Sequence, residues 1–224
     1  MLCSSDVQFI KTYGTLYTYT GTLLQTINAD DEYHAVIGLS EGALGNGLTY
    51  TASATGAITD TADNGGVLRC TDDGHTLTTG QYVTLNGMGD AAHSGTTRVT
   101  VISPDVFDCD DIAYNSIDDT GMWQRGTSFT VNPGRDGLYQ ILFGMSLLSA
   151  AANKNFKFEM VKNVTDLDEG AAETKVAIQD DLGYEGGAVN VEMVAGDVVW
   201  MKVEGTTDTT NLTIEHGYVL VNKL

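Results

Sequence analysis

The strongest constraint in this sequence is an alternation of apolar residues at every second position in its C-terminal half. The runs are Tyr139, Ile141, Phe143 and Met145; Phe156, Phe158 and Met160; Val189, Val191 and Met193; Val199, Met201 and Val203; and Leu212, Ile214, Tyr218 and Leu220. A period of two turns each set toward one face of a β-strand, whereas a helix needs apolar residues three and four positions apart. The alternation therefore predicts a β-sandwich and almost no helix.

Two of these strands also carry apolar residues on the opposite face. Leu142 does so in the first run, and Val219 and Val221 do so in the last. A strand that is apolar on both sides needs cover on both sides. We expect a partner subunit to supply the second cover.

Shorter strands are expected before residue 52. Leu16, Thr18 and Thr20 alternate with Tyr17 and Tyr19, and a second run extends from Tyr33 to Leu39. The glycine-rich piece from Glu41 to Gly47 is expected to form a turn between strands. It is not a phosphate-binding loop, because the GxxxxGK[ST] spacing and its lysine are missing.

The segment between Gly56 and Arg125 has several short strands in quick succession. These are Gly66 to Cys70, Tyr82 to Leu85, Thr97 to Ile102 and Val106 to Cys109, with an entry at Gly56 to Asp60 and an exit at Asp119 to Trp123. Short strands separated by turn residues in this way predict a small barrel of about 65 residues.

Composition favours sheet and argues against two classes of partner. The chain has 26 glycines and only 2 prolines, with many short threonine and valine runs, which is typical of strands joined by turns. Its 30 acidic and 11 basic residues give a net charge of −19, which repels nucleic acid. No stretch approaches the roughly 20 apolar residues of a membrane span, and the first residues lack the pattern of an export signal. We expect neither nucleic acid nor membrane as a partner.

The residue types that carry catalysis or bind metals do not cluster in the sequence. Cys3, Cys70 and Cys109 lack CxxC spacing, so neither a disulfide framework nor a zinc site is indicated, and the last two are expected to be core residues of the barrel. The histidines, expected to be turn and surface residues, are His34, His75, His93 and His216. No nucleophile motif is present. We assign no catalytic, cofactor-binding or metal-ligating residue, and we expect the protein not to be an enzyme.

Acidic clusters are the one candidate ligand set. They are Asp30 to Glu32, Asp72 and Asp73, Asp108 to Asp111, Asp118 and Asp119, Asp166 to Glu169, and Asp180 and Asp181. Calcium needs six to eight oxygens around one point, and none of the clusters has the EF-hand loop pattern. If a structural calcium is bound, Asp108, Asp110 and Asp111 are its first candidate ligands.

The C-terminal part resembles the C1q/TNF-like jelly roll. The matching segments, in the order typical of that family, are Phe129 to Gly134 leading into Gly137-Leu-Tyr139, Asn155 to Asn163, Val194 to Val203, and a closing strand from Leu212 to Leu224. This resemblance implies an all-β jelly-roll sandwich that assembles as a homotrimer.

The middle part resembles the small β-barrel of the FCCH type found in bacteriophage virion proteins. The matching residues are Gly74 to Gly80, Gln81 to Gly87, Gly95 to Val101 and Val106 to Asp108. Combining both resemblances, we expect residues 1–56 to supply the first jelly-roll strands, residues 57–126 to form an inserted barrel, and residues 127–224 to complete the jelly roll. Two domains in tandem remain the alternative.

These resemblances imply a structural virion protein made in the host cytoplasm. The expected function is capsid decoration, in which a trimer binds the major capsid protein on the surface of the phage head and cements it. No cofactor is expected. The alternative is the tip of a tail fibre, where the same fold would recognise a host surface glycan. A fold alone does not decide between the two.

Overall fold

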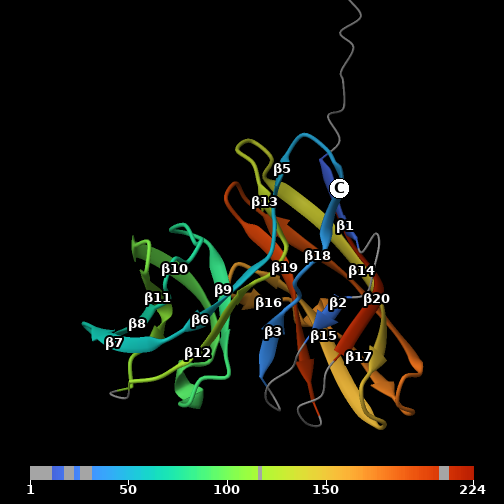
Figure 1. The fold of residues 1–224 in the computed structure, drawn as a ribbon. Helices are drawn as coiled ribbons and strands as arrows, with labels where there is room; N and C mark the ends of the chain where they lie inside the picture. The colour runs from blue at the N-terminus through green and yellow to red at the C-terminus, as the bar shows by residue number, and fades with distance from the viewer. Residues whose placement is uncertain (1–11, 18–22, 26–31, 116–117, 207–211) are drawn as a thin grey trace, which may run out of the picture.

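The computed structural model describes residues 12–17, 23–25, 32–115, 118–206 and 212–224. Within this part the protein is all-β, and its helical segments are two single 3-10 turns, η1 (Ala91–His93) and η2 (Asp168–Gly170). The strands form two sheets that face each other in a sandwich and a third, curled sheet beside them (Figure 1). The prediction of an all-β jelly-roll sandwich is confirmed.

Sheet I of the sandwich runs in the order β18, β14, β20, β1, β4, and β2 also pairs with β20. Its strands are β1 (Tyr13–Tyr17), β2 (Leu23–Gln25), β4 (Ser40–Leu44), β14 (Gly137–Ser149), β18 (Leu182–Met193) and β20 (Leu212–Lys223). Sheet II runs β16, β15, β19, β13, β5, with β17 on β15 and β3 on β19. Its strands are β3 (Tyr33–Ala35), β5 (Leu48–Thr51), β13 (Ser128–Val131), β15 (Lys154–Lys162), β16 (Thr165–Asp166), β17 (Ala172–Val176) and β19 (Val198–Gly205).

From β13 onward the chain crosses repeatedly between the two sheets. β13 lies in sheet II and β14 in sheet I, β15 to β17 return to sheet II, and β18, β19 and β20 lie in sheets I, II and I. This alternation between facing sheets is the jelly-roll arrangement. Every strand pair in both sheets is antiparallel, which lets one face of each sheet bury apolar residues while the other stays exposed.

The predicted alternation forms the core between the sheets. Tyr139, Ile141 and Phe143 of β14 pack in one cluster with Phe156 and Phe158 of β15, and all five are at most 2% exposed. Burying an aromatic side chain removes about 150–250 Å² from water, so these residues contribute much of the stability of the sandwich.

The prediction for the last strand is half wrong. Leu212 and Ile214 are buried as expected, but Val219 and Val221 are also in the core, while Tyr218 is 49% exposed. The cause is a β-bulge: Ser146 pairs with His216 and Leu147 with Ile214, so one extra residue lies on β20 between them. One extra residue moves every later side chain to the other face.

The prediction of a turn over Glu41 to Gly47 is wrong for residues 41–44, whereas residues 45–47 do connect β4 to β5. Residues 40–44 are strand β4, which pairs with β1 at the edge of sheet I, with a register shift between Gly14 and Leu16. An edge strand has a neighbour on one side only and tolerates glycine and irregular pairing better than a central strand. Of the first predicted strand, residues 18–20 lie outside the described residues.

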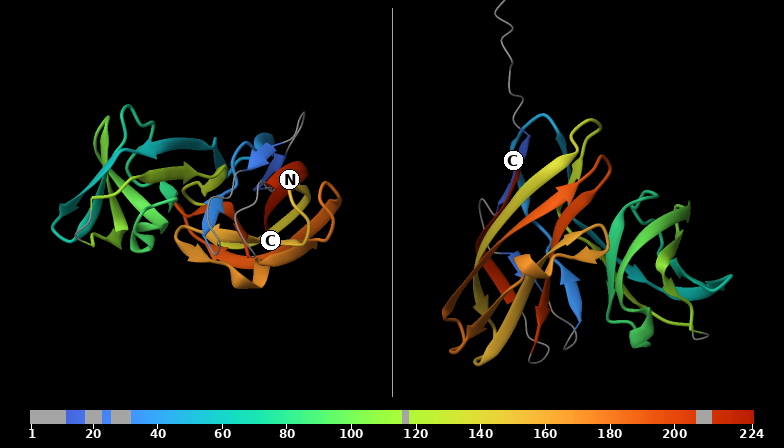
Figure 2. Two further views of the ribbon diagram at one scale, coloured as in Figure 1. Left: turned by 60° about the horizontal axis from the view of Figure 1, so that its bottom comes forward. Right: turned by 180° about the vertical axis from the view of Figure 1, so that it is seen from behind.

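The third sheet, here called the barrel module, lies between β5 and β13 in the sequence. Its order is β6 (Ala54–Ile58), β12 (Gly121–Arg125), β9 (Tyr82–Asn86), β10 (Gly95–Ser103), β11 (Val106–Ala113), β8 (Val67–Thr71), β7 (Asp60–Asn64). The edge strands β6 and β7 are consecutive in the sequence and are joined by Thr59 alone, whose N–H donates to the carbonyl of Thr71 (2.9 Å). The sheet therefore curls on itself (Figure 2).

The barrel module has its own core. Leu68, Val83, Leu85 and Phe107 are buried there around Trp123, whose indole N–H donates to Asp72 (2.6 Å). The pairing of β6 with β12 begins at Ala54, three residues before the predicted start of the insertion at residue 57. Independent folding of this module stays a prediction.

The module contacts the outer face of sheet II and the segment before β3. The carboxylate of Glu32 accepts hydrogen bonds from the N–H of Gly87 and the hydroxyl of Ser94. Of the acidic cluster at residues 30–32, Glu32 thus contacts the module, while Asp30 and Asp31 lie outside the described residues. The N–H of Thr127, just after β12, donates to the carbonyl of Val36 (3.3 Å) and connects the module to the sandwich.

Candidate interaction surface

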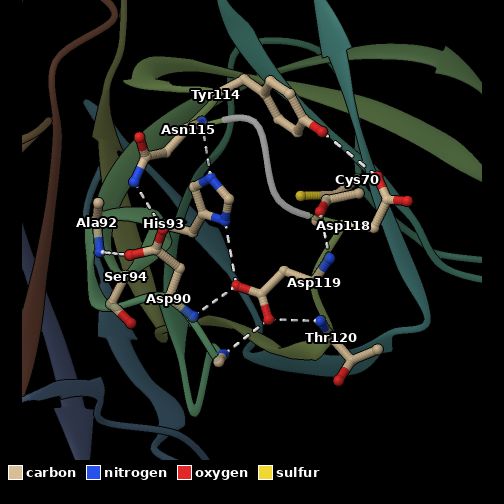
Figure 3. A network of polar contacts seen from close by, with 12 residues as sticks. Cys70, Asp90, Ala92, His93, Ser94, Tyr114, Asn115, Asp118, Asp119 and Thr120 are labelled. Atoms are coloured by element: carbon tan, nitrogen blue, oxygen red, sulfur yellow. Dashed lines mark hydrogen bonds and ion pairs between the residues drawn. The ribbon is translucent and has the colours of Figure 1, made fainter.

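A buried histidine and aspartate in the barrel module resemble a catalytic pair in composition (Figure 3). The Nδ1 atom of His93 lies 3.1 Å from Oδ2 of Asp119, and its Nε2 accepts the N–H of Asn115 (3.1 Å). Because Nε2 accepts a hydrogen bond, the proton of the neutral ring lies on Nδ1, and this N–H donates a hydrogen bond to Asp119. Both ring nitrogens are therefore occupied within the protein, and neither faces a substrate.

The carboxylate of Asp119 serves to fix the surrounding loops. It accepts further hydrogen bonds from the backbone N–H groups of Gly89, Asp90 and Thr120 (2.7–2.9 Å). Burial by itself would raise the pKa of Asp119, but the backbone N–H groups and His93 outweigh it and hold the pKa below its ordinary value. This network joins the turn at η1 to the segment that enters β12.

The expectation of turn and surface histidines is wrong for three of the four. His34 and His93 are fully buried and His75 nearly so, with its ring edge-on to Phe107 at 5.3 Å, while His216 is exposed. A neutral imidazole with hydrogen-bond partners can replace an apolar residue in a core. The spacing of histidines in the sequence carries no signal of this burial.

The two barrel cysteines are core residues, as expected. Cys70 and Cys109 are fully buried, and their Sγ atoms lie 3.6 Å apart on the neighbouring strands β8 and β11. The hydrogen bond with Cys70 and the burial raise the pKa of Cys109, which disfavours a reactive thiolate. Cys3 lies outside the described residues.

The suggested calcium ligands do not converge. Asp108 binds Arg69 through both carboxylate oxygens (2.7 and 3.0 Å), Asp110 accepts from the hydroxyl of Thr100, and Asp111 accepts the backbone N–H of Arg98. Neighbouring residues on a strand point to opposite faces, so Asp110 and Asp111 diverge. Among the described residues, no three His, Cys, Asp or Glu side chains lie together as metal ligands would.

A buried ionic cluster lies on the outer side of sheet II. Lys202 Nζ lies 2.6 Å from Asp166 and 3.6 Å from Glu159, and 3.5 Å from the centre of the Tyr33 ring. Lys157 is also 3.6 Å from Glu159. Burial raises the pKa of Glu159 despite both lysines. The cluster joins β3 to β15 and β19, and we assign it a structural role.

The outer face of sheet I carries two large, exposed aromatic side chains, Tyr184 and Tyr218. Its central rows, here called the tyrosine face, consist of Leu142, Gly144, Ser146, Tyr184, Gly186, Ala188, His216, Tyr218 and Leu220. None of these residues is Asp, Glu, Lys or Arg, although the chain has a net charge of −19. Tyr184 is 69% exposed and Tyr218 is 49% exposed. An exposed, uncharged face with large aromatic side chains is characteristic of an interaction site.

A groove of about 310 Å³ crosses this face between the two tyrosines. Its lining includes Gly144 and Ser146 of β14 and the two tyrosines of the flanking strands. Glu185 also lines it, and its carboxylate accepts the N–H of Gly186 (3.0 Å). A Cβ atom at Gly144 would lie 2.7 Å from the Tyr218 ring, so glycine is what lets this ring lie against the sheet. The buried hydroxyl of Ser146 makes no hydrogen bond within the described part of the chain.

The sequence indicated this face only in part. It correctly singled out Leu142 as an apolar residue on the non-core side of β14, but it assigned Val219 and Val221 to that side and Tyr218 to the core. The bulge in β20 exchanges these positions. Tyr184 was missed, because the strand around it is rich in glycine and has no apolar alternation before Val189.

No protein-family model matches the sequence, and neither does any curated protein. Among solved structures, the chain is similar to the Eiger TNF protein of S. frugiperda, with 11% identity and a TM-score of 0.34 over 76% of this chain and 92% of that one. It is also similar to a lipoprotein of Bacteroides thetaiotaomicron, with 7% identity and a TM-score of 0.21 over 93% and 98% of the two chains. The protein's own strand order defines its class: an all-β protein with a jelly-roll sandwich. None of its described helices has the length and apolarity to cross a bilayer.

Proposed function

We propose that this protein is a structural virion component that assembles as a homotrimer and decorates a phage capsid by binding the major capsid protein. The observation that carries the assembly is the tyrosine face, which presents apolar side chains without charge. The virion location rests on the sequence resemblances of the sandwich and the barrel module to virion proteins.

A second copy of this chain is the occupant of the tyrosine face that its chemistry fits. Two acidic chains with a net charge of −19 repel each other over most of their surfaces, so association favours a face with few carboxylates. The residues of the tyrosine face carry no charge, and the carboxylate that lines its groove, Glu185, accepts the N–H of Gly186. A side chain of a neighbouring copy can fill this groove. Aromatic residues supply large contact areas, and a hydroxyl such as that of Ser146 can find a partner across the interface.

A binding role fits the interior of the molecule better than catalysis does. The His93–Asp119 pair uses both ring nitrogens within the protein, and the thiol of Cys109 is buried with a raised pKa. A trimer that binds at several equivalent contacts gains affinity by multivalency even when each contact is weak. Salt screens the repulsion between acidic trimers, so attachment should hold or strengthen as ionic strength rises.

Copy number and heat stability of purified particles test the location. Decoration of the capsid predicts hundreds of copies per particle on a gel calibrated against the major capsid protein, and genome loss at a lower temperature after the protein is stripped. Adding the purified protein back should restore the original temperature. A few dozen copies or fewer, with unchanged heat stability and lost adsorption to host cells, would replace this proposal with the fibre-tip alternative.

A further inference from the structure

A second concave site lies between the barrel module and the outer face of sheet II, whereas the tyrosine face lies on sheet I. Figure 2 shows the barrel module beside the sandwich. The concave site, here called the module cleft, has a volume of about 260 Å³, and its lining includes Gln81, Tyr82, Arg125, Ser128, Thr130 and Trp200. Ligand pockets for drug-sized molecules are about 300–1,000 Å³, so this cleft suits a smaller ligand, such as one sugar unit.

Arg125 is the unusual residue of the cleft. Its Nε donates to the carbonyl of Ala52 (3.2 Å) and its Nη1 to the side-chain oxygen of Gln81 (2.7 Å), and both acceptors are uncharged. A guanidinium has five N–H donors, so three of them have no acceptor within the described part of the chain. These donors are available to a ligand.

Arg125 lacks the carboxylate partner that five other described cations of this acidic protein have; Arg135 and Lys223 also lack one among the described residues. The cations that lie within 4.0 Å of a carboxylate are Arg69, Arg98, Lys157, Lys162 and Lys202. No described carboxylate lies so close to Arg125, and burial lowers its pKa without any opposing ion pair. A partly buried charge that the protein itself leaves unpaired is satisfied best by a ligand of opposite charge.

The remaining groups of the cleft are neutral hydrogen-bonding groups and aromatic rings. The side-chain oxygen of Gln81 accepts from both Arg125 and the N–H of Thr78, which leaves its amide NH₂ as a donor. The hydroxyls of Ser128 and Thr130 make no hydrogen bond within the described residues, and Tyr82 adds a half-exposed ring. Hydroxyl and amide groups recognise sugar hydroxyls, and an aromatic ring packs against the C–H face of a sugar.

We propose that the module cleft binds a carboxylate-bearing monosaccharide unit, whose carboxylate pairs with Arg125 and whose hydroxyls bond to Gln81, Ser128 and Thr130. A simple anion would satisfy the guanidinium but would leave these neutral groups unused. A neutral sugar would leave the guanidinium unpaired. The inference goes beyond the proposed trimer and does not depend on it, because the tyrosine face lies on the opposite sheet.

The test is a titration of the full chain with D-glucuronate, followed by calorimetry or NMR chemical shifts, with D-glucose and sodium acetate as controls. We expect saturable binding of glucuronate with Kd in the millimolar range or tighter, and at least tenfold weaker binding of both controls. Arg125→Gln should weaken glucuronate binding at least tenfold, whereas Arg135→Gln, outside the cleft, should leave it unchanged.

Thr130→Val provides a second variant, because this hydroxyl contacts neither Arg125 nor Gln81 and its loss should not disturb folding. It should weaken glucuronate binding severalfold while the thermal unfolding temperature stays that of the parent protein. Acetate that binds as tightly as glucuronate would overturn the sugar proposal and leave an anion site only. No saturable binding, or equal binding by Arg125→Gln in a protein of unchanged fold, would overturn it altogether.

Discussion

Replacing both tyrosines of the tyrosine face by serine should dissociate the trimer. A full tyrosine side chain presents about 200 Å², so Tyr184 at 69% exposure and Tyr218 at 49% together leave about 240 Å² in water in the monomer. At about 25 cal/mol per Å², burying this surface contributes at most about 6 kcal/mol per subunit. Even half of this free energy, about 3 kcal/mol, corresponds to a more than hundredfold change in affinity.

Sedimentation equilibrium at micromolar concentration measures this effect. The parent protein should have the mass of three 23.8 kDa chains, about 71 kDa, and Y184S/Y218S should sediment as the monomer. Ile102→Ser is the matched control, because Ile102 is 50% exposed but lies on the barrel module, and its loss should leave the trimer intact. A parent protein of monomer mass, or a double variant that remains trimeric, would refute the reasoning.

Three further predictions concern stability. Deleting the barrel module and bridging Gly56 to Gly126 with a short Gly/Ser linker should leave a soluble, folded trimer, because the two cores are separate. Loss of the circular dichroism signal of folded sheet would instead indicate a shared core. Asp119→Ala should lower the free energy of unfolding in denaturant by about 3–5 kcal/mol, because several buried donors lose their acceptor. The control is Asp118→Ala at the exposed neighbouring position, which should lower the free energy of unfolding by less than about 0.5 kcal/mol. The lowered pKa of Asp119 means that its contribution is present at neutral pH and is lost as pH falls through that folded-state pKa, so the parent and Asp119→Ala should converge in strong acid. Glu159→Gln should show the opposite sign, because the raised pKa of Glu159 makes its ionised form unfavourable in the folded state. The stability of the parent relative to the variant should fall as pH rises from the ordinary glutamate pKa through the raised one, and a difference that stays constant or grows over this range would contradict this.

Much of the architecture could be predicted because strand formation is encoded locally. The alternation from Tyr139 to Met145 and from Phe156 to Met160 identified two long strands and the faces that they bury. The short strands β8, β9, β10 and β11 of the barrel module were also placed correctly, because turn residues separate them in the sequence. Edge strand β4 escaped prediction, because a glycine-rich strand with one neighbour has the composition of a turn.

The candidate surfaces could be predicted far less well. One extra residue on β20 exchanges the two faces of the strand after Ile214, and a residue pattern read at a fixed period of two misses such a bulge. The burial of His93 depends on Asp119 and Asn115, which are distant in the sequence and adjacent only in the folded barrel module.

The sequence by itself determined the all-β class, the acidic surface and most strands, because these follow from composition and from spacing between near neighbours. The tertiary structure alone decided which apolar side chains remain exposed as the tyrosine face. It also decided that Arg125, at the end of the barrel module, lies with Gln81 and Trp200 in a cleft whose lining has no carboxylate. Such sites arise from contacts between residues far apart in the chain, and no local pattern of the sequence encodes them.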